Sequence, residues 1–228
     1  MQNTKHIISI GGGGFSHSKS DLKLEKYLLS QVAPSSPKIC MLPQASRESP
    51  EYIVKFYDTF HTLGAKPTWI SLFDRVEDSW QEKLLSQDII YVGGGNTKSM
   101  LALWKTWGMD TLLKEAYNRG IVLAGVSAGA ICWFEQCMTD SVWPLGVLDG
   151  LGFLKNSCCP HYDSEPERAP AYQNNISSGA IKPGIALQDF TAAHYVDETL
   201  TKIISSVKNG KAFQVNADSA IALDVHYL

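Results

Sequence analysis

The stretch that most constrains this chain is an apolar run, residues 121–131, interrupted by a Gly-x-Ser-x-Gly pattern. Such a run is typical of a strand, a sharp turn and a helix. Gly125 and Gly129 leave room for that turn, since side chains two positions from the serine would obstruct it. Ser127 should then hold its hydroxyl at the top of a sheet, with the Ala128 N–H placed to stabilise a developing negative charge. A buried serine in a plain Gly-Ser loop is the alternative.

Length and composition are those of a globular protein. The chain has 228 residues, of which 44% are hydrophobic and 19% charged, which is enough for one α/β domain with a full core. The formal net charge is −3, and the lysines and arginines form no run. Because nucleic-acid binders usually carry a basic stripe, the expected partners are small molecules or peptides.

The compartment is inferred from the N-terminus and the cysteines. The stretch before residue 11 lacks the apolar core and cleavage site of a signal peptide, and no segment approaches ~18 uninterrupted apolar residues. The five cysteines are an odd number without metal-ligand spacing, and the adjacent Cys158 and Cys159 make a poor disulfide pair. We expect reduced thiols in a cytoplasmic protein, with core packing more frequent than a nucleophilic role.

The first half of the chain alternates strands and helices. Strands are expected at 6–10, 38–43, 68–73 and 88–92, and helices at 22–32, 51–63, 80–85 and from 99 onward. This alternation predicts an α/β fold with a doubly wound, mostly parallel sheet flanked by helices.

The second half is less regular. Residues 133–150 read as loop, and strands are expected at 184–187, 191–196, 201–207, 211–215 and 220–225. Lys208-Asn209-Gly210 predicts a C-terminal β-hairpin, because Asn-Gly favours positive φ. With no repeat, low-complexity tract or linker, residues 1–228 are expected to form a single domain.

Two glycine loops follow strands of the predicted sheet. Residues 11–14 are all glycine, but Ser16 stands where a dinucleotide-binding loop has its third glycine, so a loop that floors a cleft is the preferred interpretation. Residues 93–97 read Gly-Gly-Gly-Asn-Thr, and the Gly95 N–H is predicted to be a second oxyanion donor. Asn96 is expected either to cap the following helix or to contact substrate.

A serine nucleophile needs a base and a group that orients the base. Of six histidines, His161 follows Pro160 and opens a polar loop, where a side chain can reach over a cleft. Asp189 lies just past the apolar run 185–187. The predicted set is therefore Ser127, His161 and Asp189. An α/β-hydrolase esterase, whose order is serine, acid, histidine, would use Asp189 and His226 instead.

The motifs at 93–97, 125–130, 160–161 and 187–189 fall in the order and approximate spacing of the peptidase E family. These are aspartyl dipeptidases and their cyanophycinase relatives, with a fold similar to class I glutamine amidotransferases. The chain resembles this family over nearly its whole length. The resemblance implies that Ser127 is the nucleophile and His161 the general base, that the N–H groups of Gly95 and Ala128 form the oxyanion hole, and that no metal or cofactor is needed.

The chain departs from the family at two points. Peptidase E has a glutamate in a Leu-Pro-Glu-Gly context where this chain has Asp189 in Leu-Gln-Asp-Phe. Asp140 is a second candidate for the acid. Arg168 is expected to bind the carboxylate of a substrate that begins with aspartate, or else to pair with Glu165 or Glu167. Because residues 160–168 look more like an uncharacterised subgroup, the substrate does not follow from the resemblance.

The expected function is hydrolysis of small peptides through an acyl-enzyme. The expected partner is a small peptide, with no nucleic acid and no membrane, and a homodimer is left open. The alternatives are the esterase, an amidotransferase-like glutaminase, which is disfavoured because its nucleophile would be cysteine, and a relative of the fold that only binds a ligand.

Overall fold

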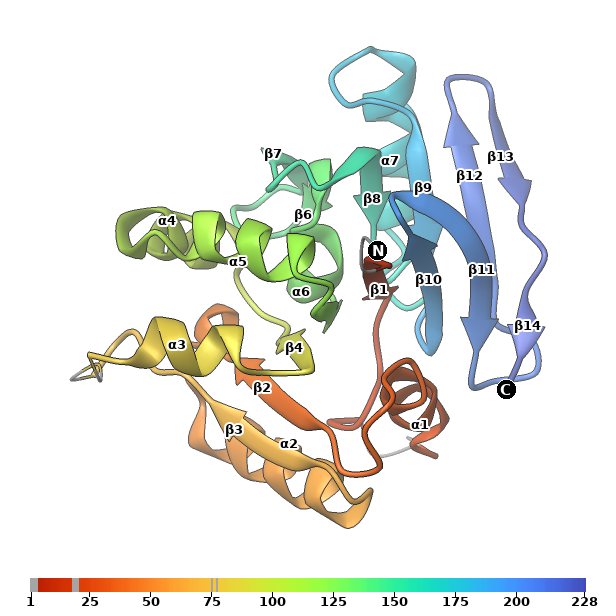
Figure 1. Cartoon of the computed structure of the whole chain (residues 1–228). Coiled ribbons are helices and arrows are strands. Elements are labelled where there is room, and N and C mark those ends of the chain that lie inside the picture. Colours follow the sequence, from red (N-terminus) through yellow and green to blue (C-terminus); the bar gives the residue numbers. More distant parts are fainter. Residues whose placement is uncertain (1–3, 18–20, 75, 77) are drawn as a thin grey trace.

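The structure is a computed structural model that describes residues 4–17, 21–74, 76 and 78–228. In this part of the chain the strands form two sheets, one of eight strands and one of six, with helices packed around them (Figure 1). The first three residues of the N-terminal stretch considered above lie outside it.

The eight-stranded sheet has a parallel centre and an antiparallel side. Its order within the described residues is β14-β11-β10-β1-β5-β4-β2-β3. Strands β1, β5, β4, β2 and β3 run parallel, whereas β10 is antiparallel to β1 and β11 antiparallel to β10. The bounds are β1 His6–Ile10, β2 Lys38–Leu42, β3 Lys66–Trp69, β4 Ile89–Val92, β5 Val122–Val126, β10 Thr191–Val196, β11 Thr199–Ser205 and β14 His226–Tyr227.

Helices cover both faces of this sheet, as the predicted doubly wound fold requires. The bounds are α1 Lys23–Leu29, α2 Pro50–Thr62, α3 Trp80–Leu85, α4 Thr97–Trp107 and α5 Met109–Asn118. The apolar stripes of α1 and α2 pack with one side of β1, and those of α3, α4 and α5 pack on the other side (Figure 1). A short 3₁₀ helix, η1 (Gln44–Ser46), follows β2.

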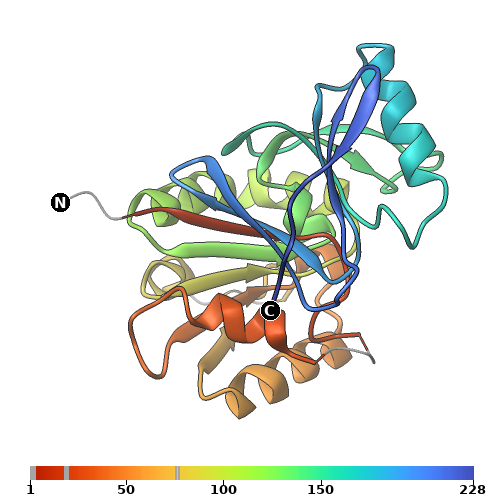
Figure 2. The ribbon, with the colours of Figure 1, turned by 90° about the vertical axis from the view of Figure 1, so that its right-hand side faces the viewer.

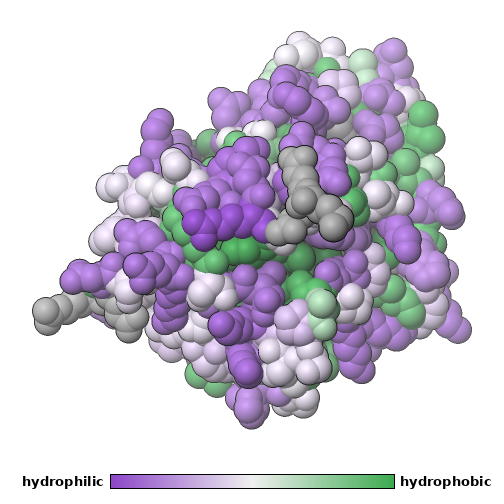
Figure 3. Space-filling model, in the orientation of Figure 1, coloured by the Kyte–Doolittle hydropathy of each residue, from purple (hydrophilic) through white to green (hydrophobic). Residues whose placement is uncertain are grey.

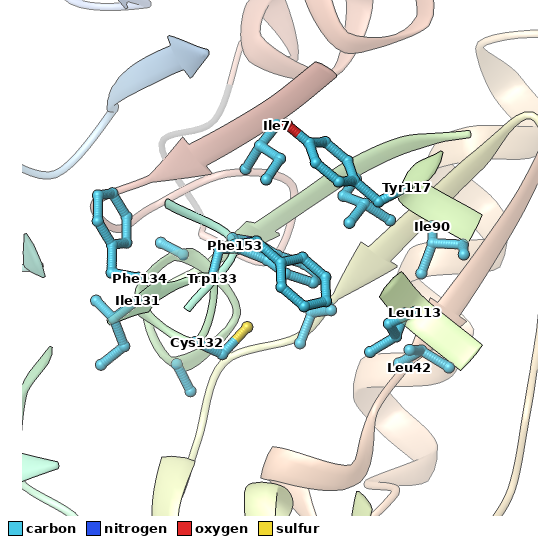
Figure 4. Packing of buried hydrophobic residues seen from close by; sticks show 14 of the residues in the cluster. Ile7, Leu42, Ile90, Leu113, Tyr117, Ile131, Cys132, Trp133, Phe134 and Phe153 are labelled. Carbon is cyan, nitrogen blue, oxygen red and sulfur yellow. The ribbon is translucent and has the colours of Figure 1, made fainter. Parts of the chain in front are cut away.

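Aromatic side chains fill the core on the α5 side. Figure 4 shows Tyr117, Trp133 and Phe153 close together between the sheet and α5. The Tyr117 and Phe153 rings are stacked with centroids 5.8 Å apart, and Trp133 lies 5.8 Å from Phe153. All three are buried, so this core ties the segment after Ser127 to the main sheet.

The six-stranded sheet has the order β13-β12-β9-β8-β6-β7 within the described residues. Its bounds are β6 Phe134–Thr139, β7 Gly146–Asp149, β8 Leu154–Cys159, β9 Gly184–Leu187, β12 Ala212–Asn216 and β13 Ser219–Ala222. Helix α7 (Arg168–Ser177) packs on it through Tyr172 and Ile176. Figure 2 shows α7 beside the long β12–β13 hairpin.

Two sequence predictions on elements were wrong in their bounds or type. Residues 133–150 contain β6 and β7, which were missed because their burial does not alternate along the strand. The third strand, predicted at 68–73, is β3 at Lys66–Trp69. Ile70 and Leu72 are buried in the loop that follows, so their apolar character reflects the core rather than a strand.

The predicted hairpin at Lys208-Asn209-Gly210 was also wrong. Both flanking strands exist, but β11 belongs to the eight-stranded sheet and β12 to the six-stranded one. A hairpin turn with two positive φ angles instead lies at Asp197-Glu198, at 47° and 68°, and joins β10 to β11. Antiparallel pairing of β12 with β13 makes a further hairpin near the C-terminus.

The surface is mainly polar on the face seen in Figure 1. Figure 3 shows hydrophilic side chains over most of this face, with hydrophobic ones in a band near its middle and scattered along its right-hand edge. Among the helices of the described residues, none is both long and apolar enough to cross a lipid bilayer.

Helix α1 buries a carboxyl group beneath the first glycine loop. Glu25 is 1% exposed, and neither of its carboxylate oxygens has a hydrogen-bond partner of normal geometry in the described structure. Burial raises the pKa of Glu25, and the nearby N–H groups of Glu25 and Phe15 offset only part of this effect. Glu25 is therefore held toward its neutral form.

The substitution Glu25→Gln tests this state, because it keeps the shape of the side chain and removes its ionisation. When folding raises a carboxyl pKa, stability is full below the unfolded pKa and is lost as the pH rises through the folded pKa. Above the ordinary value of 4.5, we expect the unfolding free energy of the wild type to fall relative to the variant by at most about 1.4 kcal/mol per pH unit in urea titrations. A difference that stays constant from low to neutral pH would contradict the assignment.

Candidate active site

Ser127 lies at the turn between β5 and the short helix α6 (Ala128–Ile131). Its φ of 56° and ψ of −113° are unusual for a residue with a side chain, as expected for a serine on a sharp strand-to-helix turn. The turn is tightly packed: a Cβ on Gly125 would lie 2.4 Å from the carbonyl oxygen of Gly129, and a Cβ on Gly129 would lie 2.1 Å from that of Val92. Close backbone packing therefore requires glycine at both positions.

His161 follows β8 and reaches Ser127. The His161 Nε2 lies 2.9 Å from the Ser127 Oγ. The backbone N–H of His161 donates to the Gly11 carbonyl at 3.2 Å. The φ of His161 is 52°, in the left-handed region. The backbone turn after β8 is thus what brings the ring over the end of β5.

Asp189 lies in the segment between β9 and β10 and approaches the other side of the imidazole. The Asp189 Oδ1 is 2.7 Å from the His161 Nδ1. Because an ionised carboxylate only accepts hydrogen bonds, the His161 proton is on Nδ1, and Nε2 then accepts from the Ser127 hydroxyl. The structure brings the three predicted residues into one hydrogen-bonded chain.

The charge state of Asp189 fits this arrangement. Burial raises its pKa, but the hydrogen bond from His161 and the attraction of the imidazole outweigh burial, so the pKa of Asp189 lies below its ordinary value. The backbone N–H of Asp189 donates to the Asp163 Oδ1 at 2.9 Å. Sequence reasoning missed Asp163, although it lies in the polar loop that His161 opens.

The first glycine loop passes directly under the pair of His161 and Asp189. A Cβ on Gly12 would lie 1.8 Å from the Asp189 Oδ1 and 2.5 Å from the His161 Nδ1. The Gly12 carbonyl accepts the N–H of Phe190 at 2.9 Å. The glycine loop was predicted to let the backbone come close to another group. That group is the pair of Asp189 and His161 side chains.

The second glycine loop lies beside Ser127. A Cβ on Gly94 would lie 3.4 Å from the Ser127 Cβ and 3.9 Å from its Oγ. Asn96 caps α4, since its Oδ1 accepts the Ser99 N–H at 2.8 Å, and its Nδ2 donates to the Ser141 carbonyl at 3.1 Å. Both ends of the Asn96 amide are thus bonded within the protein.

Asp140, the second candidate for the acid, lies near Arg168 instead of near His161. The Arg168 side chain is 2% exposed, and its Nε donates to the Glu165 Oε2 at 2.6 Å. Its Nη2 lies 3.5 Å from the Asp140 Oδ1, and Asp140 is 57% exposed. Arg168 was expected either to bind a substrate carboxylate or to pair with a nearby glutamate. In the structure it pairs with Glu165. The ring nitrogens of His161 are taken by Ser127 and Asp189, so Asp140 has no place in this chain of contacts.

The other candidate nucleophiles and bases lie elsewhere. All five cysteines are buried and free, and burial raises the thiol pKa of each, to about 12 for Cys40 and Cys159 and well above the ordinary value for Cys158. Such thiols are poor nucleophiles. His226 is exposed on β14. In the described part of the chain, no group of three histidine, cysteine, aspartate or glutamate side chains is arranged to hold a metal ion.

A sequence model of peptidase family S51 matches residues 7–203. The chain belongs to peptidase family S51. This S51 chain is 46% identical over 228 residues to a Bacillus subtilis (strain 168) protein named uncharacterized peptidase YgaJ, over 98% of this chain and 99% of that protein. It is 36% identical over 91 residues to the uncharacterized peptidase Lmo0363 of Listeria monocytogenes, over 37% of this chain and 44% of that protein.

Solved structures share the fold of the S51 chain. A peptidase from an acI-B1 actinobacterium superposes with a TM-score of 0.70 at 18% identity, over 99% of this chain and 95% of that one. A putative peptidase E protein from Listeria monocytogenes EGD-e superposes with a TM-score of 0.65 at 20% identity, over 87% of this chain and 97% of that one. The predicted likeness to the peptidase E family is confirmed, and the protein is a peptidase of the serine class.

The close contact at Gly12 gives a test of the site in this S51 peptidase. In Gly12→Ala the new methyl group must push apart Asp189 and His161, and a displacement of about 1 Å in a catalytic group costs about 10²-fold in rate. We expect kcat/KM for peptide hydrolysis to fall by at least this factor, while circular dichroism shows a folded protein. Gly146→Ala is the control, since its Cβ would come no closer than 3.8 Å to a described atom, the Pro144 oxygen. Full activity of Gly12→Ala would contradict the geometry.

Proposed function

We propose that this S51 peptidase hydrolyses short peptides, with Ser127 as the nucleophile, His161 as the general base and Asp189 as the acid that orients His161. The proposal is carried by the unbroken chain of hydrogen bonds from Asp189 through His161, at 2.7 Å, to Ser127, at 2.9 Å. This is the arrangement that activates a serine hydroxyl for acyl transfer.

In the first half of the reaction the Ser127 Oγ attacks the carbonyl carbon of the substrate peptide bond. The Oγ–C bond forms, the Ser127 proton passes to the His161 Nε2, and the carbonyl electron pair moves to oxygen. When the tetrahedral intermediate collapses, the C–N bond breaks and His161 donates its proton to the leaving amine. The product amine leaves, and an ester on Ser127 remains.

In the second half a water molecule attacks the ester carbon. His161 accepts the proton of the water, a second tetrahedral intermediate forms, and the Ser127 oxygen leaves with the proton returned by His161. Asp189, kept ionised by its lowered pKa, stabilises the imidazolium in both halves.

The oxyanion of each intermediate is assigned to the backbone N–H groups of Gly95 and Ala128. Two facts support this assignment. Gly94, the residue before Gly95, lies against Ser127, and among the described residues neither N–H donates to a backbone carbonyl. Unused donors beside the nucleophile are the requirement for stabilising charge that develops in the transition state.

The substrate class rests on the likeness to peptidase E. Arg168 gives no support for a preference for aspartate, because its guanidinium is buried against Glu165. We therefore propose short peptides without fixing their first residue.

We also propose that the enzyme works in the cytoplasm. Its five cysteines are buried free thiols, and Cys158 and Cys159 are neighbours in sequence without forming a bond. Thiols persist in reducing compartments, whereas secreted proteins usually form disulfides.

A panel of dipeptides and tripeptides tests the activity. The panel should include peptides that begin with aspartate and isoaspartyl peptides, and release of free amine should be measured for the wild type and for Ser127→Ala. We expect at least one peptide to be cleaved by the wild type and not by the variant. Cleavage that persists in Ser127→Ala would contradict the proposed nucleophile, and peptide binding without cleavage by the wild type would favour the ligand-binding alternative.

The identity of the acid is tested by a pair of substitutions. In Asp189→Asn the amide no longer holds the Nδ1–H tautomer, and loss of the equivalent group in serine proteases lowers kcat by about 10⁴-fold. We expect a similar fall here. Asp140→Asn is the matched control and should stay within about twofold of the wild type, because Asp140 is exposed and pairs with Arg168. The reverse result would make Asp140 the acid.

A further inference from the structure

Tyr52, on α2, connects the two glycine loops of the site. Its hydroxyl accepts the Gly94 N–H at 3.4 Å. Its ring stacks on Phe15, which follows the first glycine loop, with centroids 5.2 Å apart and an angle of 11° between the planes. A Cβ on Gly93 would lie 2.8 Å from the Tyr52 Cε1, so the second loop packs directly on the ring.

The Tyr52 hydroxyl is held in its neutral form. Burial raises the pKa of Tyr52 to about 12, and the hydrogen bond from the Gly94 N–H offsets part of this rise. Gly14 directly precedes Phe15, and a Cβ at this glycine would lie 3.2 Å from the Glu25 Oε1 and 3.7 Å from the Tyr91 hydroxyl. The hydroxyl of this partly buried tyrosine is therefore a neutral acceptor of the Gly94 N–H, and it also bonds to the Ser16 side chain.

The second glycine loop is fixed on both sides of Gly95. On one side the Gly94 N–H donates to Tyr52. On the other side the Asn96 N–H donates to the Ala45 carbonyl at 2.8 Å, and a Cβ on Gly95 would lie 2.1 Å from the same oxygen. The φ of Gly95 is 134°, which residues with side chains rarely adopt. Three consecutive glycines have wide conformational freedom, so the direction of the Gly95 N–H depends on these two anchors, which act together with the Gly93 N–H bonded to the Leu42 carbonyl at 3.1 Å.

We propose that Tyr52 is a positioning residue of the oxyanion hole: its hydroxyl orients the Gly94 peptide so that the Gly95 N–H is aimed at the oxyanion. This inference rests on the proposed function. Tyr52 does not touch the reacting atoms. It acts by reducing the reorganisation of the loop when charge develops on the substrate, which is the main requirement for electrostatic stabilisation of a transition state.

The test is Tyr52→Phe, which keeps the ring and its stacking and removes only the hydroxyl, with its bonds to the Gly94 N–H and the Ser16 side chain. Loss of a whole oxyanion donor costs about 10²–10³-fold in kcat, and a donor that is present but loosely held should cost less, about tenfold. We expect kcat to fall by about tenfold while KM stays within about twofold, since the loop stabilises the transition state more than the bound substrate. Thermal unfolding should stay close to that of the wild type.

Tyr57→Phe is the matched control, because Tyr57 is the next tyrosine on α2 and its hydroxyl bonds to Thr68 of β3 instead of to the second glycine loop. It should leave kcat and KM unchanged. A second readout that does not depend on turnover is hydrogen–deuterium exchange of residues 93–96, which should become faster in Tyr52→Phe and not in Tyr57→Phe.

Two failures are distinguishable. If Tyr52→Phe keeps full kcat and normal exchange in an enzyme whose activity depends on Ser127, the positioning role is overturned and the proposed function stands. If the wild type and Ser127→Ala behave alike toward every peptide, the proposed function and the positioning role are both overturned.

Discussion

The hydrogen bonds that His161 makes on either side of its ring set the tightest constraint on this structure. Ser127 stands at the end of β5 in the eight-stranded sheet, and His161 follows β8 in the six-stranded sheet. Asp189 lies on the segment that leaves the second sheet at β9 and enters the first at β10. Distances of 2.7 Å and 2.9 Å therefore hold only if both sheets keep their relative position.

Close packing of backbone supplies that position. The Gly11 carbonyl accepts the His161 N–H, and the Ile10 carbonyl just before it accepts the Ser127 N–H at 3.0 Å. The carboxyl end of β1 thus binds both halves of the site through main-chain groups. Glycine at position 12 lets this segment pass beneath the imidazole and the carboxylate. The physical cost is backbone strain at Ser127 and His161, both at positive φ.

Much of this arrangement was predictable from the sequence, and the reasons differ between elements. The parallel strands and their helices carry strong periodic or continuous apolar signals, and Gly125, Ser127 and Gly129 mark the turn. His161 and Asp189 were indicated by their place after apolar runs and by the family motifs. In the second sheet β9, β12 and β13 were predicted, whereas β6 and β7 were missed because their burial does not alternate along the strand. The roles of Asp163 and Tyr52 depend on contacts between segments 26 and 42 residues apart, which no local pattern records.

The central claim is that Ser127 is activated by His161, and site mapping with a fluorophosphonate tests it most directly. Reagents of this class phosphonylate a serine only when a base makes it nucleophilic. We predict one adduct per chain by intact-mass measurement, found by peptide mapping on Ser127 and lost in His161→Ala. A labelled serine elsewhere in the chain, or equal labelling of Ser127 without His161, would contradict the account.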